Sequence, residues 1–247
     1  MSRDDWKTVP WAKHPKSTKD TLLDILVEIP GVFEDIDNCE GLGDHKMKLE
    51  EYPRVVATCL GLHTELQSWY GALPPERRYM DTHGLEAEDE RVIEELPDMY
   101  TMLLYWATCL SLYNAMRVHS GRRPANVPPF LPDGATDLGQ YISNMSRILP
   151  FFFSPDAGKS NLLLAAFPLG TALQFMLLLK GQAWDGDRLP EEDSSRLMSL
   201  FTRPEFKPVM DFLNSLQRDN DIRGEKPAAT FEGRAKQWAG YKTLESA

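Results

Sequence analysis

The sequence predicts an all-α protein, a single helical domain in which about seven to nine helices surround two buried apolar ones. Three observations support this fold class. Apolar residues recur at intervals of three and four along most of the chain, which is the period of a helix face. Two long stretches are too apolar and too long for ordinary strands, and no segment shows the alternation typical of a half-buried strand.

The first of these stretches, residues 99–116, contains no charged residue, proline or glycine. Its largest apolar side chains recur on one face at Leu103, Trp106, Leu110 and Tyr113. A membrane span is the alternative, because about 20 apolar residues cross a bilayer. Four polar residues interrupt the run and acidic residues precede it, so we expect a helix at the centre of the protein.

Three regions follow from the composition along the chain. Residues 1–16 mix charges, prolines and two tryptophans, which predicts an N-terminal arm pinned to the body by its aromatic rings. Residues 17–217 carry the helical periodicity, and residues 218–247 are a polar C-terminal tail.

In the first half of the domain, Ser17 precedes Asp20 by three residues, the spacing of a capping box that begins a helix. The pair Pro30-Gly31 predicts the end of this helix, with a short second one from Val32. A further helix is expected over residues 53–70, before Pro74-Pro75 forbids continuation.

In the second half, residues 118–135 hold four prolines and predict a long loop. A helix is expected from about Thr136 to Pro150, and the second apolar run follows over residues 161–180. Pro168 lies inside that run and predicts a kink. Two amphipathic helices are expected over residues 191–203 and 204–217.

The charge and the cysteines limit the class of protein. A formal charge of −10 argues against direct DNA binding, because phosphate contacts require clustered lysine and arginine. The three cysteines form no close-spaced set, so we expect no structural disulfide. The first residues show no apolar signal segment, and we expect an intracellular protein of the nucleus or cytoplasm.

Catalytic and metal-binding motifs are weak. Asp35 and Asp37, with acidic clusters at 86–90 and 219–225, offer oxygen ligands of the kind that hold magnesium. Solvated helix faces produce such clusters routinely, so we predict no metal and no cofactor. His63 is the histidine best placed to point from a helix into a cavity as an acid or base. These three residues are the weak catalytic candidates.

The aromatic and methionine side chains of the two apolar runs are the candidates for a ligand pocket. Pockets for small molecules are lined mainly by apolar and aromatic side chains. The six candidates are Tyr105, Trp106, Tyr113, Phe167, Phe175 and Met176. The alternative is that these side chains simply fill the core.

Several segments, in one order, resemble a known family. They are residues 29–37 (IPGVFEDID), 66–70 (LQSWY), 103–107 (LLYWA), 153–158 (FSPDAG) and 166–174 (AFPLGTALQ). The set resembles the helical regulatory region of fungal zinc-cluster transcription factors, the fungal-specific transcription factor domain. The resemblance covers roughly residues 20–217 and implies a helical fold, an effector pocket and dimerisation. Family members also carry a six-cysteine zinc cluster and a basic linker, which these 247 residues do not contain.

Three functions are compatible with these observations. The first is a stand-alone regulatory or interaction module, acting through a protein partner or a second copy, with a small apolar ligand, in a fungal secondary-metabolite gene cluster. The second is a helical enzyme of secondary metabolism, a terpenoid or polyketide cyclase or isomerase. The third is a truncated transcription factor without activity of its own.

Overall fold

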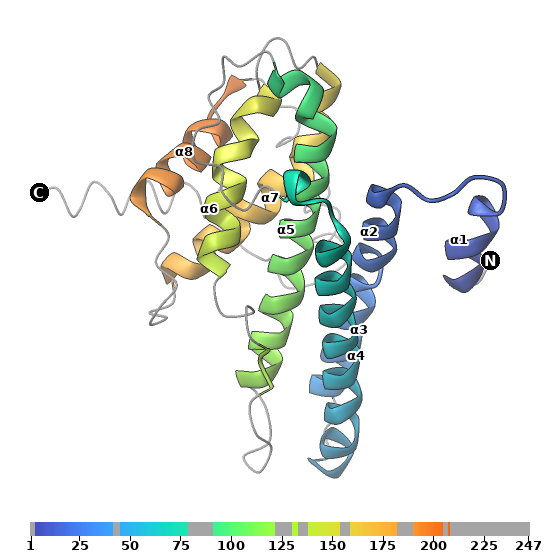
Figure 1. Ribbon diagram of the computed structural model, residues 1–247. Coiled ribbons are helices and arrows are strands. Elements are labelled where there is room, and N and C mark those ends of the chain that lie inside the picture. Colours follow the sequence, from blue (N-terminus) through green and yellow to red (C-terminus); the bar gives the residue numbers. More distant parts are fainter. Residues whose placement is uncertain are drawn as a thin grey trace, which may run out of the picture.

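The computed structural model describes residues 3–41, 45–78, 91–121, 130–132, 138–153, 159–181 and 190–204, together with Lys207. These residues are helical and contain no strand, which confirms the all-α class (Figure 1). The α-helices are α1 (Arg3–Thr8), α2 (Thr18–Leu26), α3 (Ile29–Gly41), α4 (His45–Ala72), α5 (Arg91–Gly121), α6 (Leu138–Ile148), α7 (Lys159–Gly181) and α8 (Glu191–Phe201). Short 3-10 helices are η1 (Val9–Trp11), η2 (Pro75–Arg77) and η3 (Leu149–Phe153).

Helix α5 is the centre of the molecule, as the uncharged run predicted. Every residue from Met102 to Leu110 is buried, and Thr108 satisfies its hydroxyl by donating to the Leu104 carbonyl at 2.7 Å. In the described residues, six helices surround α5 directly or through a neighbour, fewer than the seven to nine expected. Helix α7 is less buried than expected, because Leu164 and Phe167 are 39% and 47% exposed.

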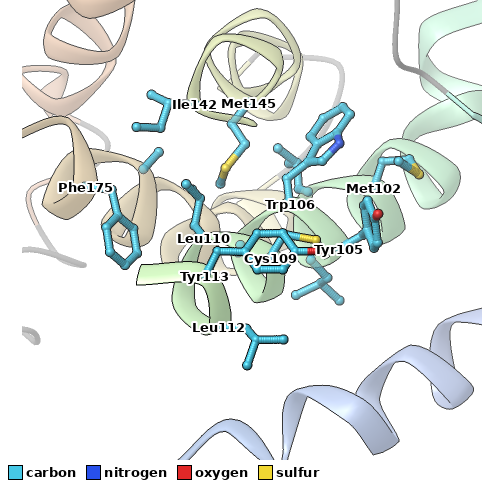
Figure 2. Packing of buried hydrophobic residues seen from close by; sticks show 14 of the residues in the cluster. Met102, Tyr105, Trp106, Cys109, Leu110, Leu112, Tyr113, Ile142, Met145 and Phe175 are labelled. Carbon is cyan, nitrogen blue, oxygen red and sulfur yellow. The ribbon is translucent and has the colours of Figure 1, made fainter. Parts of the chain in front are cut away.

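The other helices form two groups on opposite sides of α5 (Figure 1). Helices α2, α3 and α4 pack against one side, and α6, α7 and α8 pack together on the other. In Figure 2, Ile142 and Met145 of α6 face α5 from one side, and Leu112 of α5 points the opposite way. Within the described residues the two groups share no extensive interface, so α5 supplies most of the core that joins them.

The beginning of α2 confirms the predicted capping box. Ser17 Oγ accepts from the Asp20 backbone N–H at 3.2 Å, and Asp20 Oδ2 accepts from the Ser17 backbone N–H at 3.0 Å. The expected break at Pro30-Gly31 is wrong: the helix ends one turn earlier, and α3 begins at Ile29. Pro30 therefore lies in the first turn of α3, where its missing N–H costs nothing.

Two helices are longer than the sequence predicted because they continue through a proline. Helix α4 begins at His45 and contains Pro53, and α5 begins at Arg91 and contains Pro97. Both prolines are exposed, so water can bond to the carbonyl groups that lose a helical partner. Helix α7 also continues through Pro168, which is buried.

The N-terminal arm is itself helical and lies beside the body in Figure 1. Lys7 pairs with Glu28 at 2.7 Å, and Lys16 lies over the half-buried Trp11 ring at 5.7 Å from its centre. Most of the predicted loop at 118–135, most of the last expected helix at 204–217 and the tail at 218–247 lie outside the described residues.

Candidate functional site

A cleft of about 530 Å³ lies at the end of the bundle where α4 ends and α5 begins. Its size falls within the range of pockets that hold small molecules, about 300–1,000 Å³. The described lining residues are Ser17, Thr18, Lys19, Leu73, Arg77, Leu96, Pro97, Asp98, Tyr100, Thr101, Met102, Phe152 and Leu164. They come from both groups of helices, so the cleft crosses α5 from one group to the other.

Hydrogen bonds hold the α2–α4 wall of the cleft in place. Trp69 Nε1 donates to the Thr18 carbonyl at 2.9 Å and thereby fixes the start of α2 against the last turns of α4. Arg78 closes the end of α4 by donating from Nε to the Leu73 carbonyl at 2.9 Å and from Nη2 to the Gly71 carbonyl at 2.6 Å. The short helix η2 between them carries Arg77 into the lining.

The cleft has an apolar floor and a charged rim. Leu73, Leu96, Met102 and Phe152 are each less than 7% exposed. At the rim, Arg77 Nε lies 3.3 Å from Asp98 Oδ2, and both side chains are about half exposed. Burial raises the pKa of the half-buried Tyr100, so its phenol remains a neutral hydrogen-bonding group at physiological pH.

A second polar cluster lies inside the core, around Cys109 (Figure 2). The thiol is hydrogen-bonded to the phenols of Tyr105, Tyr113 and Tyr141. Burial raises the pKa of Cys109 to about 12 and raises the pKa of all three tyrosines. The thiol and phenols are therefore neutral at physiological pH, and the cluster contains no thiolate nucleophile.

His63 and Gln67 of α4 extend this cluster toward the surface. His63 Nδ1 lies 3.0 Å from Tyr113 Oη, and Gln67 Nε2 donates to the same oxygen at 3.2 Å. Burial lowers the pKa of the half-buried His63, which favours the neutral ring. Among the predicted residues, His63 and Tyr113 form the best acid–base pair, but neither belongs to the described lining of the cleft.

The predicted pocket residues do not line the cleft. Tyr105, Trp106, Tyr113, Phe175 and Met176 are buried members of the core, each no more than 5% exposed. Phe167 lies on the surface at 47% exposure. The part of the central run that does reach the cleft is its beginning, at Tyr100, Thr101 and Met102.

The two acidic candidates lie on α3, away from the cleft lining. Asp35 is half-buried and pairs with Arg54 of α4 at 3.3 Å, whereas Asp37 is exposed. The described residues contain no group of three or more His, Cys, Asp or Glu side chains placed to hold a metal ion. The acidic clusters at 86–90 and 219–225 lie outside the described residues.

A third polar network joins α6 to α8. Asp193, in the first turn of α8, is 2% exposed and accepts from Ser143 Oγ and from Ser146 Oγ, the latter at 2.9 Å. Arg196 Nη1 donates to the same carboxylate at 2.9 Å, and Arg147 Nε lies 4.0 Å from it. Every contact links the two helices or neighbouring turns, which is the arrangement of a structural junction.

Sequence reasoning missed Lys19, Arg77 and Asp98, the charged residues of the described cleft lining. Arg77 lies in a strongly charged segment, and Lys19 lies in the first turn of an expected helix. Their spacing in the sequence therefore does not distinguish them from other surface charges. Asp98 precedes the uncharged run directly, and this position was the one available signal.

Comparisons with family models, with curated proteins and with solved structures find no match. In the described part of the chain, no helix combines the length and apolar content that crossing a membrane requires.

Proposed function

We propose that this chain is a regulatory or interaction module that binds a small, largely apolar molecule and acts through a protein partner or a second copy. The resemblance to the fungal-specific transcription factor domain supports this class. On the same resemblance we propose a location in the nucleus or cytoplasm and a role in a secondary-metabolite gene cluster.

The cleft between the two groups of helices is the observation that carries the proposal. It has the size and apolar floor of a ligand site. Its walls belong to α2 and η2 on one side and to η3 and α7 on the other. A molecule bound there contacts both groups, so its binding energy can bias their arrangement around α5.

The enzyme alternative has less support, because the described lining of the cleft contains one carboxylate and no histidine. Asp98 is the carboxylate of the described lining, and it pairs with Arg77. His63 and Tyr113 form the pair best suited to proton transfer, and they lie elsewhere. A cyclase or isomerase needs such groups within reach of the bound substrate.

Binding can be tested with N-phenyl-1-naphthylamine, a neutral dye that becomes fluorescent in an apolar site. Leu164 lines the cleft and is 39% exposed, so Leu164→Trp fills the cleft without disturbing the core. We expect this variant to lower dye affinity about tenfold or more, since about 1.4 kcal/mol corresponds to a factor of ten. Leu60→Trp, at an exposed leucine of α4, is the matched control and should leave affinity unchanged. Equal binding by both variants would refute the cleft as the site.

Regulation is tested in the source organism by deleting the gene and restoring it as wild type, Leu164→Trp or Leu60→Trp. The proposal expects a set of transcripts to be lost together and recovered with wild type and Leu60→Trp only. Accumulation of a single precursor with unchanged transcripts would instead establish the enzyme.

A further inference from the structure

Among the described lining residues of the cleft cations outnumber anions, although the chain as a whole is acidic. The whole sequence carries a formal charge of −10, but the described lining contains two cations, Lys19 and Arg77, and one anion, Asp98. A local excess of positive charge at the rim of an apolar cleft attracts an anion and orients it.

Arg77 retains capacity to bind an acid. Its ion pair engages Nε at 3.3 Å from Asp98 Oδ2, and the two side chains are 50% and 40% exposed. A guanidinium has five N–H donors in a planar fork, so its Nη groups can bind a second carboxylate or sulfonate. An exposed pair of this kind is weak and yields readily to a competing anion.

Lys19 forms no ion pair with a described residue, although it is exposed at the rim. The neighbouring acid Asp20 is held by Ser17, whose backbone N–H and Oγ donate to Asp20 Oδ2 at 3.0 Å and 2.6 Å. The capping box directs this carboxylate to its own helix start, so Lys19 attracts Asp20 at a distance without pairing with it, and its ammonium group can still bind a ligand.

We propose that the cleft binds an amphipathic monoanion, an apolar body that ends in one carboxylate or sulfonate group. The head group lies between Lys19 and Arg77, and the body lies against Leu96, Met102 and Phe152. This inference rests on the proposed function and names the chemical class of its ligand.

Other ligand classes fit the same lining less well. A neutral apolar molecule covers the two cations without pairing them, which costs desolvation energy. A nucleotide brings several negative charges, whereas the described lining offers two cations, one of them paired with Asp98, and an apolar floor. A cation meets one carboxylate that is already paired with Arg77.

Two dyes that differ by a single group test the proposal. 8-Anilinonaphthalene-1-sulfonate is N-phenyl-1-naphthylamine with one added sulfonate, so the ratio of their dissociation constants isolates the anionic head. We expect the sulfonate to bind wild type about tenfold tighter, the size of one charge-assisted interaction at a partly exposed site. Sodium decanoate should likewise displace the neutral dye more effectively than decanol.

Variants assign this preference to the two cations. Arg77→Met and Lys19→Met should each reduce the ratio to about threefold or less, and the double variant should abolish it. The matched controls are Arg54→Met, at an exposed arginine paired with acids on α3 and α4, and Lys13→Met in the arm. They change the net charge equally and should preserve the ratio. Asp98→Asn should raise sulfonate affinity, because it removes the competing carboxylate.

The possible outcomes separate this inference from the proposed function. Equal affinity for both dyes in wild type, with both blocked by Leu164→Trp, would overturn the anionic class but support the ligand site. The anionic class would also be overturned if Arg54→Met abolished the difference between the two dissociation constants, or if Arg77→Met or Lys19→Met left that difference unchanged. If Leu164→Trp leaves both dyes bound, the proposed site itself fails. If a variant does not fold, the ratio of the two dissociation constants is measured for wild type in about 0.05 M and 0.5 M salt. The proposal requires a smaller preference for the sulfonate at the higher salt concentration, because salt screens the charges.

Discussion

His63 is a half-buried titratable group whose ring contacts Tyr113 of the core. In the neutral ring Nδ1 can accept from the Tyr113 hydroxyl, whose oxygen already accepts from Gln67. A protonated ring has two N–H donors and no acceptor, so Nδ1 would point a donor at Tyr113 and could no longer accept its proton. The cost of charging His63 is desolvation, because its ring is half-buried.

The stability of the protein should fall in mild acid because of this residue. Burial lowers the pKa of His63, so the unfolded chain binds the proton at a higher pH than the folded chain. The stabilisation is complete above about pH 6.5, the ordinary pKa, and is lost as pH falls through the lower folded value. Urea unfolding of wild type and His63→Gln across this range should give a smaller slope for the variant. His14→Gln, in the arm, should match wild type, and identical slopes for wild type and His63→Gln would contradict the argument.

At the scale of elements, the junction between α6 and α8 tests how much burial matters to an ion pair. Arg196 has two acidic partners on its own helix, the buried Asp193 and Glu192, whose side chain is 81% exposed. Asp193 also accepts from two serines of α6, so its removal leaves buried donors without an acceptor.

Asp193→Ala should therefore lower the free energy of unfolding by about 1–3 kcal/mol, the cost of leaving buried polar groups unsatisfied. Glu192→Ala removes the exposed partner of the same arginine and should have no resolvable effect. Chemical denaturation measures both. Equal losses for the two variants would show that the arginine pairing, and not the buried network, holds α8 in place.

The helices could be predicted from the sequence, whereas the cleft between them could not. Regular spacing and the Ser17 capping box revealed the helices, because burial on one face and an unsatisfied helix start leave local signatures. Phe167 was expected in a pocket because α7 is apolar nearly all round and its sequence does not distinguish an inner from an outer face. The cleft could not be predicted, since its lining combines short pieces of separate elements that only packing brings together.

At the scale of the whole molecule, α5 makes the two groups of helices one cooperative unit. Leu110 is fully buried, and Leu110→Ala should lower the free energy of unfolding by about 2–5 kcal/mol. Hydrogen exchange should show equal loss of protection at Leu66 of α4 and Ile142 of α6, because both groups depend on the same helix. Leu60→Ala, on the exposed face of α4, should leave both unchanged. Loss in one group alone would mean that the groups unfold separately.

The central position of α5 also matters while the protein is being made. The ribosome releases α2–α4 before α5, and α5 before α6–α8. Until α5 emerges, Leu66 and the neighbouring core side chains of the first group have no permanent cover. A nascent chain that has reached residue 121 then displays the side of α5 that α6 and α7 later conceal. Exposed apolar surface of this kind is what chaperones bind, so we expect chaperones to bind the nascent chain until its second half is synthesised.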